Sequence, residues 1–97
     1  MERIYERFLR RLSEMGFEME VEERQVVKCR HKGTGLWFEV AQKYLVLLRA
    51  REMEAILAAL QKGIEAGRSG EVFLQVSRQG EAFRVEMKAR CMEMTIR

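Results

Sequence analysis

The sequence contains no aspartate, no asparagine and no proline, and its single histidine is His31. Aspartate orients the histidine of catalytic triads, ligates calcium and magnesium, and forms half of many acid–base pairs. Its absence removes many common enzyme designs, although glutamate can replace it in some of them. We therefore predict a protein that is not an enzyme and needs no metal or other cofactor.

Cysteine is scarce as well, and long apolar runs are missing. The only two cysteines are Cys29 and Cys91, and the N-terminus lacks the apolar segment and small-residue cleavage site of a signal peptide. No apolar run approaches the ~20 residues that a membrane-spanning helix needs. These features predict a cytoplasmic protein with reduced thiols and no membrane association.

What is present describes an ordinary globular domain. The chain has 97 residues, of which 47% are hydrophobic and 34% are charged. This length predicts one compact domain spanning residues 1–97. The formal net charge is +3 and the isoelectric point is about 9.1, a mild excess of basic residues. Such a balance permits contact with nucleic acid without requiring it.

Apolar residues recur at helical spacing in two segments. The first segment covers residues 3–15 and is followed by Gly16, a residue type that commonly lies just past a helix end. The second covers residues 51–66, with Gly63 or Gly67 as its expected end and no good N-terminal capping residue. The apolar stripes consist of Ile4, Tyr5, Phe8, Leu9, Leu12 and Met15, and of Met53, Ile56, Leu57, Leu60 and Ile64.

Between these helices, apolar and polar residues alternate in three segments, which predicts three strands of an antiparallel meander. In the first hairpin we expect Met19 opposite Val27, Phe17 opposite Cys29 and Glu18 opposite Lys28. In the second hairpin we expect the cross-strand pairs Cys29–Phe38, Val27–Val40, Lys28–Glu39 and Arg30–Trp37. Apolar residues then meet apolar residues, and charges mostly meet opposite charges.

The remaining segments complete the predicted order α-β-β-β-β-α-β-β-β. Residues 44–48 are apolar at every position, which predicts a strand buried on both faces. The last third predicts a hairpin with Val76 opposite Phe83, followed by a short strand at residues 92–96. The fold class is α+β with two layers, a mainly antiparallel sheet and two helices on one face. That face is expected to hold Phe17, Val27, Phe38, Val46, Leu74 and Val85.

Cys29, His31 and Cys91 are the residues closest to a metal or nucleophile site. Cys29 and His31 lie two apart on one strand, so their side chains point the same way. A zinc site would still need a fourth ligand, and the usual paired-cysteine or paired-histidine spacing is missing. A nucleophilic cysteine would lack a third residue to orient the histidine. A buried thiol and a strand-end histidine are the favoured interpretation.

The face of the sheet away from the helices holds the candidate binding residues. They are Arg30, Trp37, Leu45, Leu47, Phe73, Arg84 and Arg90. Aromatic rings among arginines suit single-stranded nucleic acid, whose bases stack on rings and whose phosphates meet cations. Apolar side chains bordered by arginine and tryptophan also suit a protein or self-association interface, which these residues taken alone favour, with Trp37, Leu45, Leu47 and Phe73 as anchors.

We therefore predict a small binding module with two candidate partners. The basic isoelectric point favours single-stranded nucleic acid as the first hypothesis. The alternative is a homodimeric adaptor, inhibitor or chaperone-like module that binds protein through the apolar outer face. Met92, Met94 and Ile96 form the expected edge strand for self-association, because two copies pairing there would cover an unguarded edge.

Overall fold

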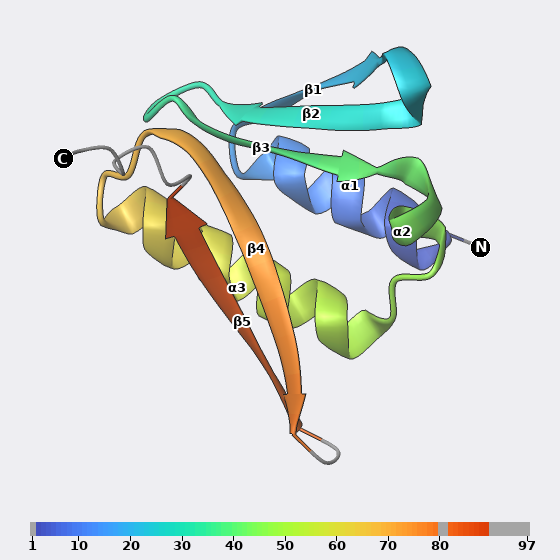
Figure 1. Cartoon of the computed structure of the whole chain (residues 1–97). Coiled ribbons are helices and arrows are strands. Elements are labelled where there is room, and N and C mark those ends of the chain that lie inside the picture. Colours follow the sequence, from blue (N-terminus) through green and yellow to red (C-terminus); the bar gives the residue numbers. More distant parts are fainter. Residues whose placement is uncertain (1, 80–81, 90–97) are drawn as a thin grey trace, which may run out of the picture.

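A computed structural model describes the chain at residues 2–79 and 82–89, with side chains at residues 2–23 and 25–73. Helices and strands form the α+β fold that the sequence predicts (Figure 1). The helices are α1 (Ile4–Glu14), α2 (Gln42–Val46) and α3 (Ala50–Glu65), and a short 3-10 helix, η1, covers Glu23–Gln25. The strands are β1 (Phe17–Glu22), β2 (Val26–His31), β3 (Leu36–Ala41), β4 (Gly70–Gln79) and β5 (Ala82–Ala89).

The five described strands lie in the order β1-β2-β3-β4-β5. All neighbours pair antiparallel except β3 and β4, which run parallel over the pairs Leu36↔Gly70 and Trp37↔Glu71. Parallel neighbours require a crossover connection, and α3 supplies it here. The predicted meander is therefore interrupted once, and the sheet is mixed and mostly antiparallel. The strand expected at residues 92–96 lies outside the described residues.

The predicted strand at residues 44–48 is wrong, because the chain forms the short helix α2 there. Leu45 is 4% exposed, whereas Val46 is 62% and Leu47 is 72% exposed. Only one side of this segment is therefore buried. A short apolar run cannot be assigned to strand or helix by periodicity alone, and this run is too short for its helical period to show.

The two longer helices confirm the predicted segments, and backbone groups at their ends find partners. The Arg3 amide donates to Glu6 Oε1 over 2.9 Å, and the Arg49 amide donates to Glu52 Oε1 over 3.1 Å. In both helices, a first-turn glutamate therefore accepts the amide of the N-cap residue, as in the reciprocal half of a capping box. Gly67, at φ +72°, ends α3, and its amide and that of Arg68 donate to carbonyls of the last turn.

The predicted register is confirmed for one hairpin and wrong by two residues for two others. β2 and β3 pair as expected, with Cys29 opposite Phe38. Met19, however, lies opposite Cys29, because the three-residue connection η1 begins one residue later than the expected loop at residues 22–24. In β4–β5, Val76 lies opposite Val85 instead of Phe83. A shift of two residues keeps each side chain on its face, so face alternation alone does not detect it.

The core lies between the sheet and the helices α1 and α3 (Figure 1). Phe17, Val27 and Phe38 are buried there as predicted, and Val46 is not, because it belongs to α2. The side chains of Leu74 and Val85 lie outside the described part. The buried apolar residues are Phe8, Leu12, Phe17, Val27, Cys29, Leu36, Phe38, Leu45, Met53, Ile56, Leu57, Leu60 and Val72.

His31 joins two turns at one end of the sheet. Its Nδ1 accepts a hydrogen bond from the Thr34 amide over 3.1 Å, so the ring proton is on Nε2. That nitrogen lies 3.0 Å from the Met15 carbonyl oxygen, to which it donates. The ring also packs edge-on against Phe17, with centroids 5.3 Å apart. His31 therefore ties the α1–β1 turn to the β2–β3 turn.

Candidate functional site

The outer sheet face brings together some of the predicted binding residues. Arg30 is exposed, and Trp37 lies opposite it on β3, partly buried. The cation over the indole ring is Lys28, whose Nζ lies 4.4 Å from the ring centroid. Arg30 was the expected cross-strand neighbour of Trp37, but the cation that lies over its ring is that of Lys28. Trp37 is thus partly covered by its own chain before any ligand arrives.

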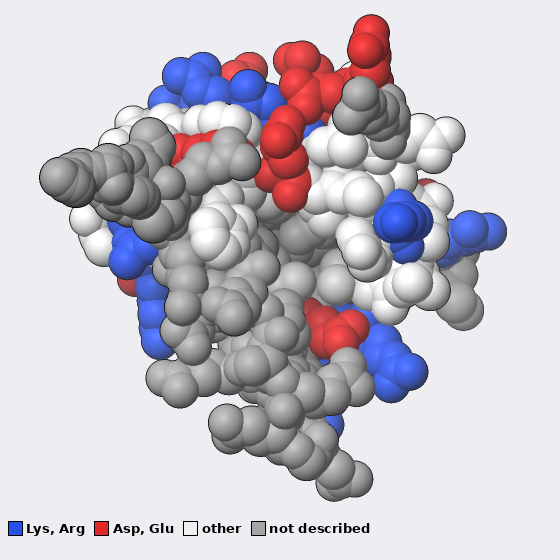
Figure 2. Space-filling view, viewed as in Figure 1, with Lys and Arg blue, Asp and Glu red and all other residues white. Residues whose placement is uncertain are grey.

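Glutamates outnumber basic residues on this face over β1 to the start of β4. The register places Glu18 opposite Arg30, and places Lys28 between Glu20 and Glu39. Glu22 and Glu71 point to the same side as these residues, by the alternation of the strands. Figure 2 shows red acidic side chains gathered over the upper part of the molecule, where β1 and β2 lie, with fewer blue groups among them. This part of the outer face is acidic.

Two of these carboxyls interact directly. Hydrogen bonding with Glu39 raises the pKa of the Glu22 carboxyl above its usual range; desolvation and the charge of Glu39 add to this, and Lys28 opposes it. The pair is stable when it holds a proton and is repulsive when both groups are ionised. At neutral pH it is therefore a place where an added cation stabilises the surface.

Glu22→Gln is expected to stabilise the protein at neutral pH relative to wild type, and to lose that advantage in acid. A raised folded-state pKa contributes stability below the ordinary glutamate value of 4.5, and that contribution disappears as pH rises through the raised pKa. Urea unfolding at about pH 3.5 and pH 7 measures the difference. Glu39→Gln is the matched variant and should behave alike. A difference that does not change with pH would contradict the pairing.

Leu45 and Leu47 lie at a different place from the one predicted. Leu45 and Leu47 lie in and just after α2, so they are not on the outer sheet face. They and Phe73 line a pocket of about 570 Å³ between β3, α2, α3 and the start of β4. We call it the α2 pocket. Its described lining residues are Phe8, Phe38, Glu39, Val40, Ala41, Tyr44, Leu45, Leu47, Leu48, Glu52, Ile56 and Phe73.

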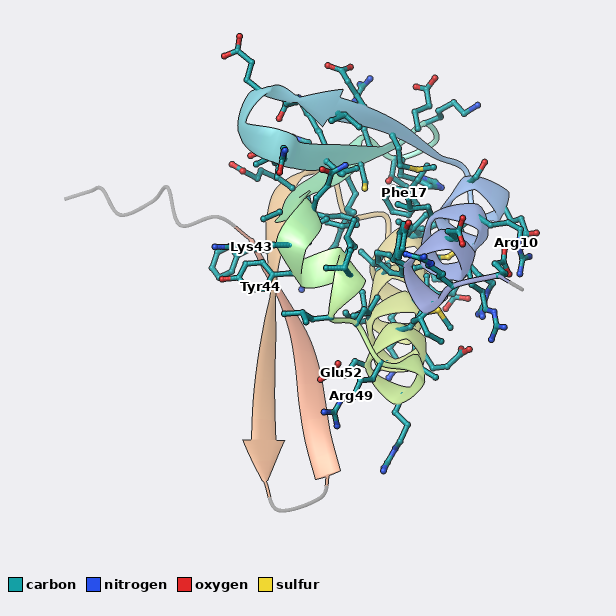
Figure 3. The ribbon with its side chains drawn as sticks, turned by 90° about the vertical axis from the view of Figure 1, so that its right-hand side faces the viewer. Arg10, Phe17, Lys43, Tyr44, Arg49 and Glu52 are labelled. Carbon is teal, nitrogen blue, oxygen red and sulfur yellow. The ribbon has the colours of Figure 1, made fainter. Side chains whose placement is uncertain are left out.

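The α2 pocket has an apolar interior and an exposed apolar rim. Phe8 and Phe38 are core residues that also reach the pocket wall, whereas Leu47, Tyr44 and Phe73 are 72%, 60% and 48% exposed. Figure 3 shows Tyr44 projecting from α2 on the side away from α1, with Lys43 beside it. Lys43 Nζ lies 5.4 Å from the centroid of the Tyr44 ring, which therefore already has a cation at one face.

The acidic residues among the described lining are two glutamates, and the lining contains no lysine, arginine or histidine. Glu39 lies on β3, where it also interacts with Glu22. Glu52 lies in the first turn of α3, where it accepts the Arg49 amide; Figure 3 shows the two residues together. The pocket therefore presents apolar side chains with carboxylates at its border, a combination that the outer-face prediction did not include.

The other predicted residues do not form a site in the described part of the chain. Burial raises the pKa of the Cys29 thiol to about 12, so the thiol stays protonated and is a poor nucleophile. Within residues 2–79 and 82–89, no group of three His, Cys, Asp or Glu is placed to hold a metal ion. Arg84 lies on β5 opposite Ser77, and its side chain is outside the described part. The predicted site residues that lie outside the described ranges are Arg90, Cys91, Met92, Met94 and Ile96.

Comparison with known proteins finds no matching family model, no similar curated protein and no similar solved structure. Among the described residues, no helix has the length and apolar character needed to cross a bilayer.

Proposed function

We propose that this protein is a binding module that recognises another protein through the α2 pocket. The observation that carries the proposal is the exposure of Tyr44, Leu47 and Phe73 around one apolar cavity. Apolar side chains gathered at a hollow are typical of interaction sites, whereas single exposed ones are common anywhere. Full burial of one such side chain contributes about 1.5–3 kcal/mol. The three together supply the central anchors of an interface.

The charges beside the pocket favour a basic partner segment. Glu39 and Glu52 border the cavity, and Glu22 adds a second carboxyl next to Glu39. A lysine or arginine of the partner would relieve the repulsion between Glu22 and Glu39 while its neighbour fills the pocket. The proposed occupant is therefore an apolar side chain, aromatic or aliphatic, carried on a segment that also contains basic residues.

Single-stranded nucleic acid has less support from the geometry. Phosphate needs cations, and the described outer face carries Glu18, Glu20, Glu22, Glu39 and Glu71 against Lys28 and Arg30. Lys28 already lies over Trp37, the ring expected to stack on a base. The nucleic-acid hypothesis stays a prediction, and so do the homodimer and the absence of enzymatic activity.

Leu47→Glu is expected to weaken binding to a protein partner by at least about hundredfold, because it places a charge on the pocket rim. The probe is a displayed library of short random peptides, selected on the wild-type protein. Enriched peptides should combine an aromatic or aliphatic residue with lysine or arginine. Calorimetric titration of one selected peptide into each variant gives the change in Kd.

Val46→Glu is the matched control, because the neighbouring Val46, at the end of α2, is also well exposed (62%) but does not line the pocket. It should leave the Kd within about threefold of wild type, since surface changes away from an interface are nearly neutral. Equal losses of affinity in both variants would contradict the proposal.

Light scattering tests whether a second copy of the chain occupies the pocket. A wild-type dimer that Leu47→Glu dissociates would assign the pocket to a second copy. Binding of an oligothymidine that weakens steeply with salt would make single-stranded nucleic acid the favoured ligand.

A further inference from the structure

The strand β1 lies at one edge of the sheet, with β2 on one side and no described strand on the other. The Lys32 amide donates to the Gly16 carbonyl over 3.0 Å, just before the first residue pair of the β1–β2 ladder. Bonding in an antiparallel ladder alternates by residue. Backbone groups of Glu18, Glu20 and Glu22 therefore face β2, and those of Phe17, Met19 and Val21 face the open edge.

The side chains of β1 divide this edge into an acidic and an apolar face. Glu18 and Glu20 are exposed on the outer face, and Glu22 follows them. On the helix side, Met19 is partly buried and Val21 is 65% exposed, although its partner Val27 is buried. The apolar face of the sheet therefore extends to the β1 edge, where no described residue covers Val21.

This edge disfavours pairing with its own copy. Two antiparallel β1 strands that keep their faces aligned must place glutamates opposite glutamates, for example Glu18 opposite Glu22 and Glu20 opposite Glu20. Like charges directly opposite each other destabilise a strand pair. Charges at an edge strand are a common device against self-association. A partner strand with the opposite charge meets no such penalty.

We propose that the β1 edge binds an extended segment of a partner protein in which lysine or arginine alternates with apolar residues. The segment adds a strand to the sheet by bonding to the backbone of Phe17, Met19 and Val21. Its cations lie opposite Glu18, Glu20 and Glu22. Its apolar residues cover Val21 and Met19 and extend the inner layer. β2 and β3 separate this edge from the α2 pocket, so this proposal does not rest on the pocket.

The test uses two synthetic peptides, one of alternating lysine and valine and one of alternating glutamate and valine. The lysine peptide should bind at least about tenfold more tightly, because each cross-strand charge pair contributes a modest amount and three are made. In ¹⁵N-edited NMR spectra, the amides of Phe17, Met19 and Val21 should shift most and become protected from exchange. Shifts confined to Tyr44, Leu47 and Phe73 would mean pocket binding and overturn the edge proposal.

Charge reversal provides the variant test. The double variant Glu18→Lys/Glu20→Lys should bind the glutamate peptide more tightly than the lysine peptide. The control Glu65→Lys changes an exposed residue of α3 and should leave the preference for the lysine peptide unaltered. Val21→Pro should abolish binding, since it removes an amide that faces the open edge, while Val21→Ala should retain most of it. No binding by wild type at millimolar peptide, or equal binding of both peptides, would also overturn the proposal.

Discussion

Phe38→Ala is expected to lower the free energy of unfolding by about 3–5 kcal/mol. Phe38 is 2% exposed on β3, and its ring packs edge-on against Phe17, with centroids 5.8 Å apart. Removing the ring also opens the α2 pocket into the core, because Phe38 forms part of its wall. The new cavity, the lost ring contact and the lost burial all lower the free energy of unfolding.

Urea unfolding followed by circular dichroism measures this effect. Phe38→Leu is the control, since it retains most of the apolar volume and should cost roughly half as much or less. The same pair of variants separates packing from binding, because a peptide that fills the pocket should lose more affinity in the alanine variant. A loss below about 1 kcal/mol for Phe38→Ala would mean that this ring is not central to the core.

Gly16→Ala is expected to cost about 2–3 kcal/mol for two reasons that add. Gly16 has φ +100°, a conformation that costs a residue with a Cβ about 1–2 kcal/mol. An added Cβ would also lie 3.1 Å from His31 Nε2, which donates to the Met15 carbonyl. Displacing the ring weakens a partly buried hydrogen bond, worth about 1 kcal/mol.

Gly67→Ala separates the two contributions. Gly67 also has positive φ, +72°, but an added Cβ there meets no atom within 4 Å. Its cost should therefore be the backbone cost alone, about 1–2 kcal/mol. In a His31→Ala background, Gly16→Ala should fall to the value of Gly67→Ala, as a double-mutant cycle measures. If Gly16→Ala destabilises the His31→Ala variant as much as it destabilises wild type, contact with His31 does not contribute to the effect of the substitution.

The sequence was sufficient for the parts of the fold where one periodicity persists. The stripes ending at Gly16 and Gly67 located α1 and α3, and the alternation across Lys28 and Glu39 located β2 and β3 with the correct register. It failed at residues 44–48, where every position is apolar and a strand and a helical turn have the same pattern. The position of η1 and the parallel β3–β4 pairing depend on contacts that no local pattern contains.

The sequence identified some residues of the candidate site but placed them on the outer sheet face instead of at a pocket. Leu47 and Phe73 were named as exposed apolar anchors, and both line the α2 pocket. The sequence placed Leu47 on a strand, so it did not bring Tyr44 or Glu52 to the same site. The signal that could have found them is the run from Tyr44 to Leu48, which has more apolar residues than one buried face can hold.

The parallel ladder between β3 and β4 is short. Among the described residues, its pairs are Leu36↔Gly70 and Trp37↔Glu71. Phe73 lies two residues beyond the last of these pairs, while Tyr44 and Leu47 belong to the other side. The α2 pocket therefore spans the boundary between two parts of the sheet, and a side chain that fills it contacts both parts at once.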